Sequence, residues 1–111
     1  MNLVKIKDIF TSPDIDKNIF IGGWVRAFRA KKFIELNDGS TIKNIQCVIL
    51  DSSIDEKIIK KISIGCSLNV KGNIVKSIGK GQSLKIQIYS IERLDEWDPA
   101  KYPLTQTNQN L

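Results

Sequence analysis

The chemistry open to this chain is limited first by the reactive side chains that it lacks. Its 111 residues contain no histidine, so neither a Ser-His-Asp nor a Cys-His nucleophilic arrangement can form. The two cysteines, Cys47 and Cys66, lie 19 positions apart without CxxC spacing, which offers too few ligands for zinc. We interpret both as reduced core residues. We therefore predict no catalytic residue, no cofactor site and no metal site in this chain.

The side chains with recognisable binding chemistry suit single-stranded nucleic acid. An exposed ring at Phe33 can stack on a base, a contact worth roughly 1–3 kcal/mol. The amide of Gln46 is both a donor and an acceptor and can read the edge of a base. Four nearby cations can meet phosphates, namely Arg26, Arg29, Lys31 and Lys32. Pattern alone leaves three alternatives open: Phe33 covers one end of the fold, Gln46 is a solvated strand residue, and the cations solvate an edge.

The alternation of apolar and polar residues places Phe33 and Gln46 on one surface. Residues 33–38, FIELND, alternate apolar residues with Phe33 and its polar neighbours, as a half-buried strand does. Residues 38–40, DGS, indicate a turn. Residues 42–50, IKNIQCVIL, predict a third strand in which Gln46 alternates with core residues. Two neighbouring strands of this kind would expose Phe33 and Gln46 on the same face.

Three further strands are predicted around this pair. Residues 18–30, NIFIGGWVRAFRA, predict a long first strand that bends or bulges at its glycine pair. Residues 67–76 and 84–94 predict the fourth and fifth strands, joined by a turn at residues 79–81. Residues 4–10 predict either one helical turn or an extended lead-in that packs apolar side chains on the domain.

A helix is predicted between the third and fourth strands. Ser53 and Glu56 have the spacing of a capping box, in which each side chain accepts from an amide at the helix start. Behind it, isoleucines recur every four residues at Ile54, Ile58 and Ile62. We expect about ten residues of helix beginning near Ser53 and ending before Gly65, with the isoleucines plugging the core.

The order of these elements predicts the fold class. Three strands, a helix and two strands, with a glycine-kinked first strand, are the order of the five-stranded OB barrel. We therefore predict an all-β antiparallel OB-fold barrel with one helix between strands three and four. Strands two and three of such barrels and the adjacent loops commonly bind oligonucleotides. The predicted domain is residues 1–94, followed by a linker or tail at 95–111.

Charge and hydropathy narrow the class of partner. Lys and Arg number 17 against 12 Asp and Glu, which gives a net charge of +5 and favours polyanions. A genome rich in lysine and isoleucine would produce the same balance, so charge alone does not decide. The sequence has no signal-peptide core and no apolar run of the roughly 18 residues that a membrane span needs. We predict a cytoplasmic protein without a membrane partner.

An ordered set of short motifs resembles one family. GWVR, FIELNDGS, IQCVI, GCSLNVKG, GKGQ and YP occur in the order found in the N-terminal anticodon-binding domain of bacterial-type asparaginyl-tRNA synthetase, a class II enzyme. The resemblance runs from about residue 3 to residue 104. It implies that Phe33 stacks on the central uridine of a tRNA anticodon and that Gln46 hydrogen-bonds it. It also implies that Arg26 and Arg29 contact the anticodon or its backbone.

The resemblance departs at the end of the chain. In the family, YP leads to a KRHS-like segment and then to a catalytic domain that binds ATP with Mg²⁺ and that commonly dimerises, whereas here YPLTQTNQNL follows. We therefore expect the chain to be either a shortened product of a full asparagine–tRNA ligase or a free-standing relative. Three functions remain open: anticodon recognition within a synthetase, a free-standing OB-fold module for RNA, and a protein-interaction or dimerisation domain.

Overall fold

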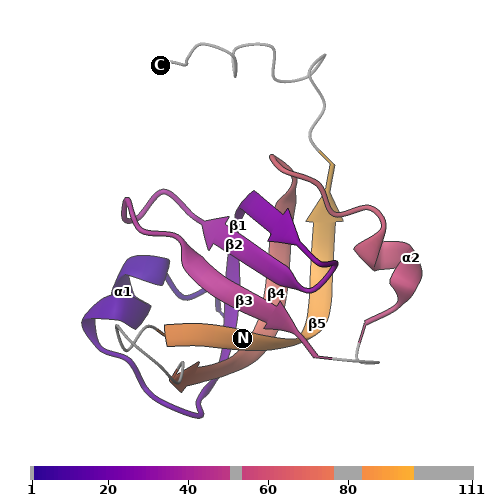
Figure 1. Cartoon of the computed structure of the whole chain (residues 1–111). Coiled ribbons are helices and arrows are strands. Elements are labelled where there is room, and N and C mark those ends of the chain that lie inside the picture. Colours follow the sequence, from indigo (N-terminus) through magenta and orange to yellow (C-terminus); the bar gives the residue numbers. More distant parts are fainter. Residues whose placement is uncertain (1, 51–53, 77–83, 97–111) are drawn as a thin grey trace.

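Five strands close into a barrel in the computed structural model, which describes residues 2–50, 54–76 and 84–96 (Figure 1). The ring order is β1-β2-β3-β5-β4. The bounds are α1 Ile6–Thr11, β1 Asn18–Arg29, β2 Phe33–Asn37, β3 Ile45–Ile49, α2 Glu56–Ile59, β4 Ser67–Lys76 and β5 Leu84–Asp95. The predicted barrel with a helix between its third and fourth strands is confirmed. The turn predicted at 79–81 and the tail beyond residue 96 lie outside the described residues.

The prediction that every strand pair is antiparallel is wrong at one seam. β3 pairs with β5 in parallel, with Cys47 beside Ile86 and Ile49 beside Ile88. The other four seams are antiparallel. The reason is parity, because neighbours around a closed ring of five strands cannot all alternate in direction. The seam closes the ring and brings β5 beside the strand that carries Gln46.

The core forms on the inner side of the alternating strands. Ile34 and Leu36 of β2 and Ile45 and Cys47 of β3 have no exposed surface. Burying one aliphatic side chain of this size contributes about 1.5–3 kcal/mol. These contacts fix which side of β2 and β3 faces inward. The intervening residues of both strands are therefore held on the outside of the barrel.

The first strand changes partner in its middle. Residues 18–24 of β1 pair with β4, and residues 24–29 pair with β2, so Trp24 belongs to both seams. Gly23 permits the close approach to β2, because a Cβ there would lie 2.6 Å from the carbonyl oxygen of Asn37. The bulge lies between Val25 and Ala27, with Arg26 as the extra residue. The sequence predicted either a bend or a bulge at the glycine pair, and the bulge instead lies later in β1, in the part of the strand that pairs with β2.

The helix between β3 and β4 is shorter than the isoleucine spacing predicts. α2 has four residues, and the side chain of Asp55 caps it by accepting from the Lys57 amide at 2.9 Å. Ser53, the expected cap, lies outside the described residues. The amide of Ile62 bonds to the carbonyl three residues before it, so the last turn tightens and the α-helix stops. Ile62 is nevertheless buried, because an irregular segment carries it into the core.

The N-terminal segment is helical and is attached to the loop between β2 and β3. Ile6 and Ile9 of α1 are buried, which confirms that this segment packs on the barrel. Asp38 Oδ2 accepts from the Ile6 amide at 2.9 Å, and Ser40 Oγ accepts from the Lys7 amide at 3.0 Å. Partial burial opposes ionisation of Asp38, but hydrogen bonds from Ser40 and Ile6 outweigh it and lower the pKa of this carboxyl.

Candidate nucleic-acid interface

Phe33 lies on the outer surface of the barrel at the start of β2. Its side chain is 37% exposed, whereas the next residue, Ile34, is completely buried. It pairs with Arg29 of β1 on one side and with Val48 of β3 on the other. An aromatic ring in this position presents a face to solvent while the strand beneath it stays anchored. A base can therefore stack on Phe33 without opening the core.

Gln46 lies on the same outer surface, on the neighbouring strand. It is partly buried and stands between the buried residues Ile45 and Cys47. Because Val48 is opposite Phe33, Gln46 is the diagonal neighbour of Phe33, at a separation of roughly 7 Å for such pairs. A stacked base and the amide that reads its edge need about this spacing. We call the outward side chains of Arg29, Phe33, Glu35, Asn44 and Gln46 the β2–β3 face.

Two of the four predicted cations adjoin Phe33. Arg29 is its direct cross-strand partner and forms an ion pair with Glu35 at 2.9 Å. Lys32 Nζ lies 5.9 Å from the centre of the Phe33 ring, within the range of a cation–π contact. Arg26 is exposed at the bulge of β1, farther along the strand. Stacking surface and positive charge therefore occur side by side at the Phe33 end of the β2–β3 face.

Lys31 is placed differently from the other predicted cations. It lies in the turn between β1 and β2, where Ala30 and Lys31 both have positive φ, at 56° and 55°. Lys31 lines a shallow cavity of about 220 Å³ together with Phe28 and residues of α2. The structure therefore groups Arg29, Lys32, Phe33 and Gln46 on one surface and turns Lys31 toward α2.

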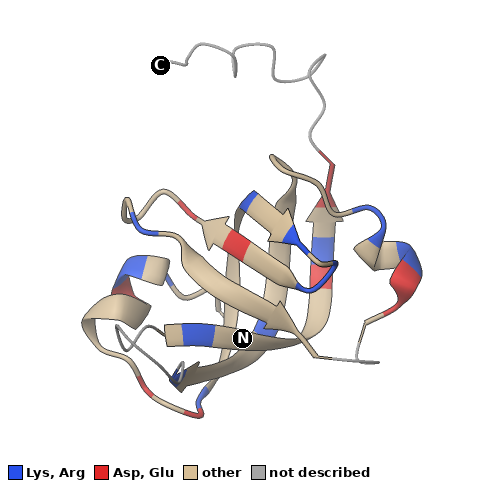
Figure 2. Ribbon diagram, viewed as in Figure 1, with Lys and Arg blue, Asp and Glu red and all other residues tan. Residues whose placement is uncertain are grey.

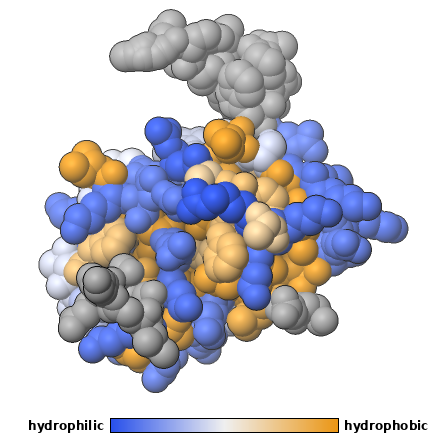
Figure 3. Space-filling model, in the orientation of Figure 1, coloured by the Kyte–Doolittle hydropathy of each residue, from blue (hydrophilic) through white to orange (hydrophobic). Residues whose placement is uncertain are grey.

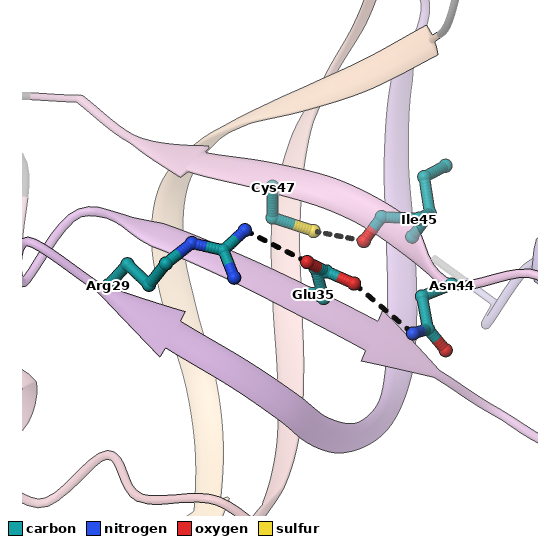
Figure 4. Close-up of polar contacts among 5 residues, drawn as sticks. All are labelled: Arg29, Glu35, Asn44, Ile45 and Cys47. Carbon is teal, nitrogen blue, oxygen red and sulfur yellow. Dashed lines mark hydrogen bonds and ion pairs between the residues drawn. The ribbon is translucent and has the colours of Figure 1, made fainter.

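Glu35 and Asn44 complete the face, and neither was predicted from the sequence as a binding residue (Figure 4). Glu35 Oε2 accepts from Arg29 Nη2 at 2.9 Å, and its Oε1 accepts from Asn44 Nδ2 at 3.2 Å. The hydrogen bonds from Arg29 and then Asn44 hold the pKa of Glu35 below its usual value. Period-two alternation already places Glu35 on the side of Phe33. The contact with Asn44, which lies before β3, could not be read from that period.

Charge and apolar surface alternate over this side of the molecule. Figure 2 shows basic residues at the β1–β2 connection and an acidic position within β2. In the same orientation, Figure 3 shows apolar surface interrupted by hydrophilic side chains. Lys85 of β5 lies beside Gln46 through the parallel seam and adds a cation that strand order alone did not reveal. The mixture suits a ligand with flat apolar bases and a charged backbone.

Other reactive groups are buried or scattered. Burial raises the pKa of the Cys47 thiol to about 12, and burial also raises that of Cys66. Both cysteines are unlinked, as predicted. Within residues 2–50, 54–76 and 84–96, no group of three His, Cys, Asp or Glu side chains is gathered as a metal site requires. No helix in the described part of the chain is long and apolar enough to cross a membrane.

The chain is similar to known asparagine–tRNA ligases over nearly its whole length. It is 42% identical over 111 residues to the asparagine–tRNA ligase of Borreliella burgdorferi, covering 96% of this chain and 24% of that protein. It is 40% identical to the corresponding ligase of Azobacteroides pseudotrichonymphae, covering 100% of this chain and 25% of that protein. The chain thus spans about a quarter of the length of the curated relatives that it matches.

Solved structures agree on the fold. The crystal structure of asparaginyl-tRNA synthetase from Pyrococcus horikoshii, complexed with asparaginyl-adenylate, superposes with a TM-score of 0.70 at 18% identity, covering 89% of this chain and 24% of that one. Residues 19–94 match the tRNA anticodon model described as an OB-fold nucleic acid binding domain. This match includes all five strands except the first residue of β1 and the last of β5. The chain therefore belongs to the tRNA anticodon-binding family of OB-fold nucleic acid binding domains.

Proposed function

We propose that this chain binds the anticodon loop of a tRNA on the β2–β3 face, as the anticodon-reading part of an asparagine–tRNA ligase. The observation that carries the proposal is the exposed ring of Phe33 with Gln46 as its diagonal neighbour, in a chain similar to such ligases. An OB barrel binds single strands across its second and third strands, which are the strands that bear these two residues.

The proposed division of labour follows from the side-chain chemistry. The ring of Phe33 stacks on the central base of the anticodon and supplies affinity that is nearly independent of base identity. The Gln46 amide can donate to a uracil carbonyl and accept from its N3–H, whereas cytosine presents the reverse pattern at N4–H₂ and N3 and requires the amide to turn over. Phe33 then holds the base and Gln46 selects it.

The cations are proposed to position the strand rather than to read it. Arg29 and Lys32 flank the stacking site, and Arg26 extends positive charge along β1. Contacts to phosphate fix register and orientation without carrying sequence information. Lys31, which faces α2, would meet a phosphate farther along the RNA.

The activity of a longer protein is part of the same proposal. The curated relatives are about four times the length of this chain, so a catalytic domain that joins asparagine to tRNA with ATP and Mg²⁺ would lie in the remaining part. A cytoplasmic location and a homodimeric parent belong to the same proposal. For the chain alone we predict no ATP-dependent asparagine activation. Pyrophosphate exchange above background with the pure chain would contradict that prediction.

The test of the proposed function is a titration with anticodon stem-loops. We expect a stem-loop with the asparagine anticodon to bind more tightly than one with a cytidine at the central position. Affinity should also fall with rising salt, since phosphate contacts release counterions. A duplex of the same stem, without the anticodon loop, serves as the control. Equal binding of all three RNAs would contradict anticodon reading and leave a general RNA-binding module.

A protein-interaction domain is the second candidate. It is favoured by apolar side chains that remain exposed, notably Trp24 at 52% and Ile64 at 68%. Such residues also occur singly on ordinary surfaces. The titration separates the two candidates. An anticodon-binding domain should show salt-dependent RNA binding, and a protein-interaction domain should not.

A further inference from the structure

The β2–β3 face contains a carboxylate where an RNA-binding surface would be expected to avoid one. Glu35 is the only acidic residue in β2, in β3 and in residues 24–29 of β1. It stands between Ala27 of β1 and Gln46 of β3 as their cross-strand partner. A negative charge there repels phosphate. Its presence therefore calls for a role that a neutral side chain would not fill.

Glu35 lies within a series of side-chain hydrogen bonds that crosses the β2–β3 face. It accepts from Arg29 at one oxygen and from Asn44 at the other, at 2.9 and 3.2 Å (Figure 4). Asn44 Oδ1 accepts in turn from Asn37 Nδ2 at 3.0 Å. Asn37 also accepts from the Gly39 amide at 2.7 Å, within the loop that follows β2. One carboxylate thus connects the β1–β2 hairpin with the β2–β3 loop across the face.

These contacts fix the orientation of two groups that can bind RNA. A carboxylate only accepts hydrogen bonds, so the NH₂ of Asn44 must point toward Glu35 and its oxygen away. The guanidinium of Arg29 uses one edge for Glu35 and keeps other N–H groups for a ligand beside Phe33. A side chain held in its binding orientation loses less entropy on association. The lowered pKa of Glu35 keeps the carboxylate charged through the physiological range.

We propose that Glu35 is a positioning and discriminating residue of this face: it holds Arg29 beside Phe33 and keeps phosphate away from Gln46. A base edge, rather than the backbone of the RNA, then meets the Gln46 amide. This inference rests on the proposed function, because it assumes that RNA lies across Phe33 and Gln46. It goes beyond that function by giving a role to an acidic residue on a surface for a polyanion.

The sign of one substitution tests the proposal. If Glu35 contributed only negative charge, Glu35→Ala would tighten binding of every stem-loop. We expect the reverse, a loss of about five-fold for the matched stem-loop, which corresponds to about 1 kcal/mol for an oriented surface pair. We also expect the preference for a central uridine over cytidine to shrink. Glu35→Gln, which keeps an acceptor oxygen of the same reach, should recover part of the loss.

Glu92 supplies the matched control for charge. It is an exposed carboxylate on β5 that accepts from Ser90 and pairs with Lys71 at 3.5 Å, away from the β2–β3 face. Glu92→Ala changes the net charge by the same amount as Glu35→Ala. We expect it to leave binding unchanged or to tighten it slightly for all stem-loops alike. Thermal melts of both variants show whether the barrel remains folded.

A double-mutant cycle distinguishes positioning through Arg29 from a direct effect. In the Arg29→Ala background, Glu35→Ala should cause no further loss, because the group that Glu35 positions is gone. Equal losses in both backgrounds would overturn the positioning role, as would tighter binding of the Glu35→Ala single variant. Failure of the proposed function looks different: the wild type would not bind, or Phe33→Ala would bind like wild type.

Discussion

Two surfaces of this barrel each combine an aromatic ring, a nearby lysine and an ion-paired carboxylate. On the β2–β3 face, Lys32 lies 5.9 Å from the ring of Phe33, and Glu35 pairs with a cation. On a second surface, which we call the β1–β4–β5 face, Lys71 lies 5.9 Å from the ring of Phe20 and pairs with Glu92. The second face is defined by the outward side chains of Phe20, Lys71, Ser90 and Glu92. Each face therefore has a phenylalanine ring, a lysine near that ring and a carboxylate in an ion pair.

The two faces differ in which cation contacts the ring and which cation pairs with the carboxylate. On the β1–β4–β5 face one lysine serves both the ring and the carboxylate, since Lys71 contacts Phe20 and Glu92 together. On the β2–β3 face these contacts are divided, because Lys32 adjoins the ring while Arg29 binds Glu35. Of the two faces, only the β2–β3 face has a glutamine as the diagonal neighbour of an exposed ring. The two faces therefore differ in the residues that adjoin the ring: Arg29 and Gln46 adjoin Phe33, whereas Lys71 adjoins Phe20.

The largest expected effect compares the two phenylalanines. Phe33→Ala should weaken binding of the anticodon stem-loop by roughly 1–3 kcal/mol, the value of one aromatic stack. Phe20→Ala should leave the affinity unchanged, since its ring lies beneath Lys71 on the other face. Titration of both variants, with circular dichroism to confirm folding, measures the contrast. Equal losses would mean that the binding surface is not confined to the β2–β3 face.

The next effect concerns base selection by a glutamine. Gln46→Ala should reduce the preference for a central uridine over cytidine by about 1 kcal/mol, the net value of one hydrogen bond. Gln87 is the matched control, because it lies on the adjacent strand β5 opposite Val48. Gln87→Ala should preserve the preference. The measurement is the binding of both variants to stem-loops that differ only at the central base. If Gln46→Ala retains the preference for uridine, Gln46 does not read that base.

A smaller effect concerns the lysines, which should act through salt dependence. Lys32→Ala should reduce the slope of log affinity against log salt by about 0.7, the value for one phosphate contact on a single strand. Arg26→Ala should behave similarly and weaken all stem-loops alike. Lys71→Ala should leave the slope unchanged, because Lys71 lies on the β1–β4–β5 face, away from the proposed RNA-binding surface. Titrations at two salt concentrations measure the slopes, and a change in Lys71→Ala equal to that in Lys32→Ala would show unspecific attraction to the whole barrel.

The smallest effect concerns two strained backbone positions, one at either end of β1. Ala30 has φ of 56° after the strand, and Asp16 has φ of 68° before it. Ala30→Gly should raise the free energy of unfolding by about 0.5 kcal/mol, because glycine adopts positive φ without strain but loses more entropy on folding. Asp16→Gly should gain less, since aspartate tolerates this region better than alanine. Denaturant unfolding measures both, and a loss of stability in Ala30→Gly would contradict the strained turn.

The sequence alone predicted much of the surface, because alternation along a strand is a local property of the backbone. Each side chain of an extended segment points opposite to its neighbours. The buried partners Ile34 and Cys47 therefore place Phe33 and Gln46 outside without reference to any other strand. The same reasoning identified the strands themselves, and β4 begins and ends at the predicted residues.

Local pattern was a weaker guide where hydrogen bonds end an element. The isoleucines at 54, 58 and 62 have helical spacing, yet α2 spans only Glu56–Ile59. The amide of Gly65 bonds to the carbonyl oxygen of Val25 at 2.8 Å, so the chain after the helix is drawn onto β1. Burial of Ile62 needs no helix once this contact forms. Ile62 is buried and Ile54 packs against the core, but Ile59 rather than Ile58 packs there with them. The prediction that Ile58 helps to plug the core is therefore wrong.

The tertiary structure decided which separate segments meet. Lys85 stands beside Gln46 only because ring closure makes β5 run parallel to β3, and Asn44 reaches Glu35 only through the loop that joins β2 and β3. Such neighbours depend on how separate segments pair with one another, which no local period encodes. The sequence by itself determined the stacking ring, the reading amide and the side of the strand on which each lies. Pairing between strands determined their neighbours: the β1–β2 hairpin places the Glu35 carboxylate beside Arg29, and barrel closure places Lys85 beside Gln46.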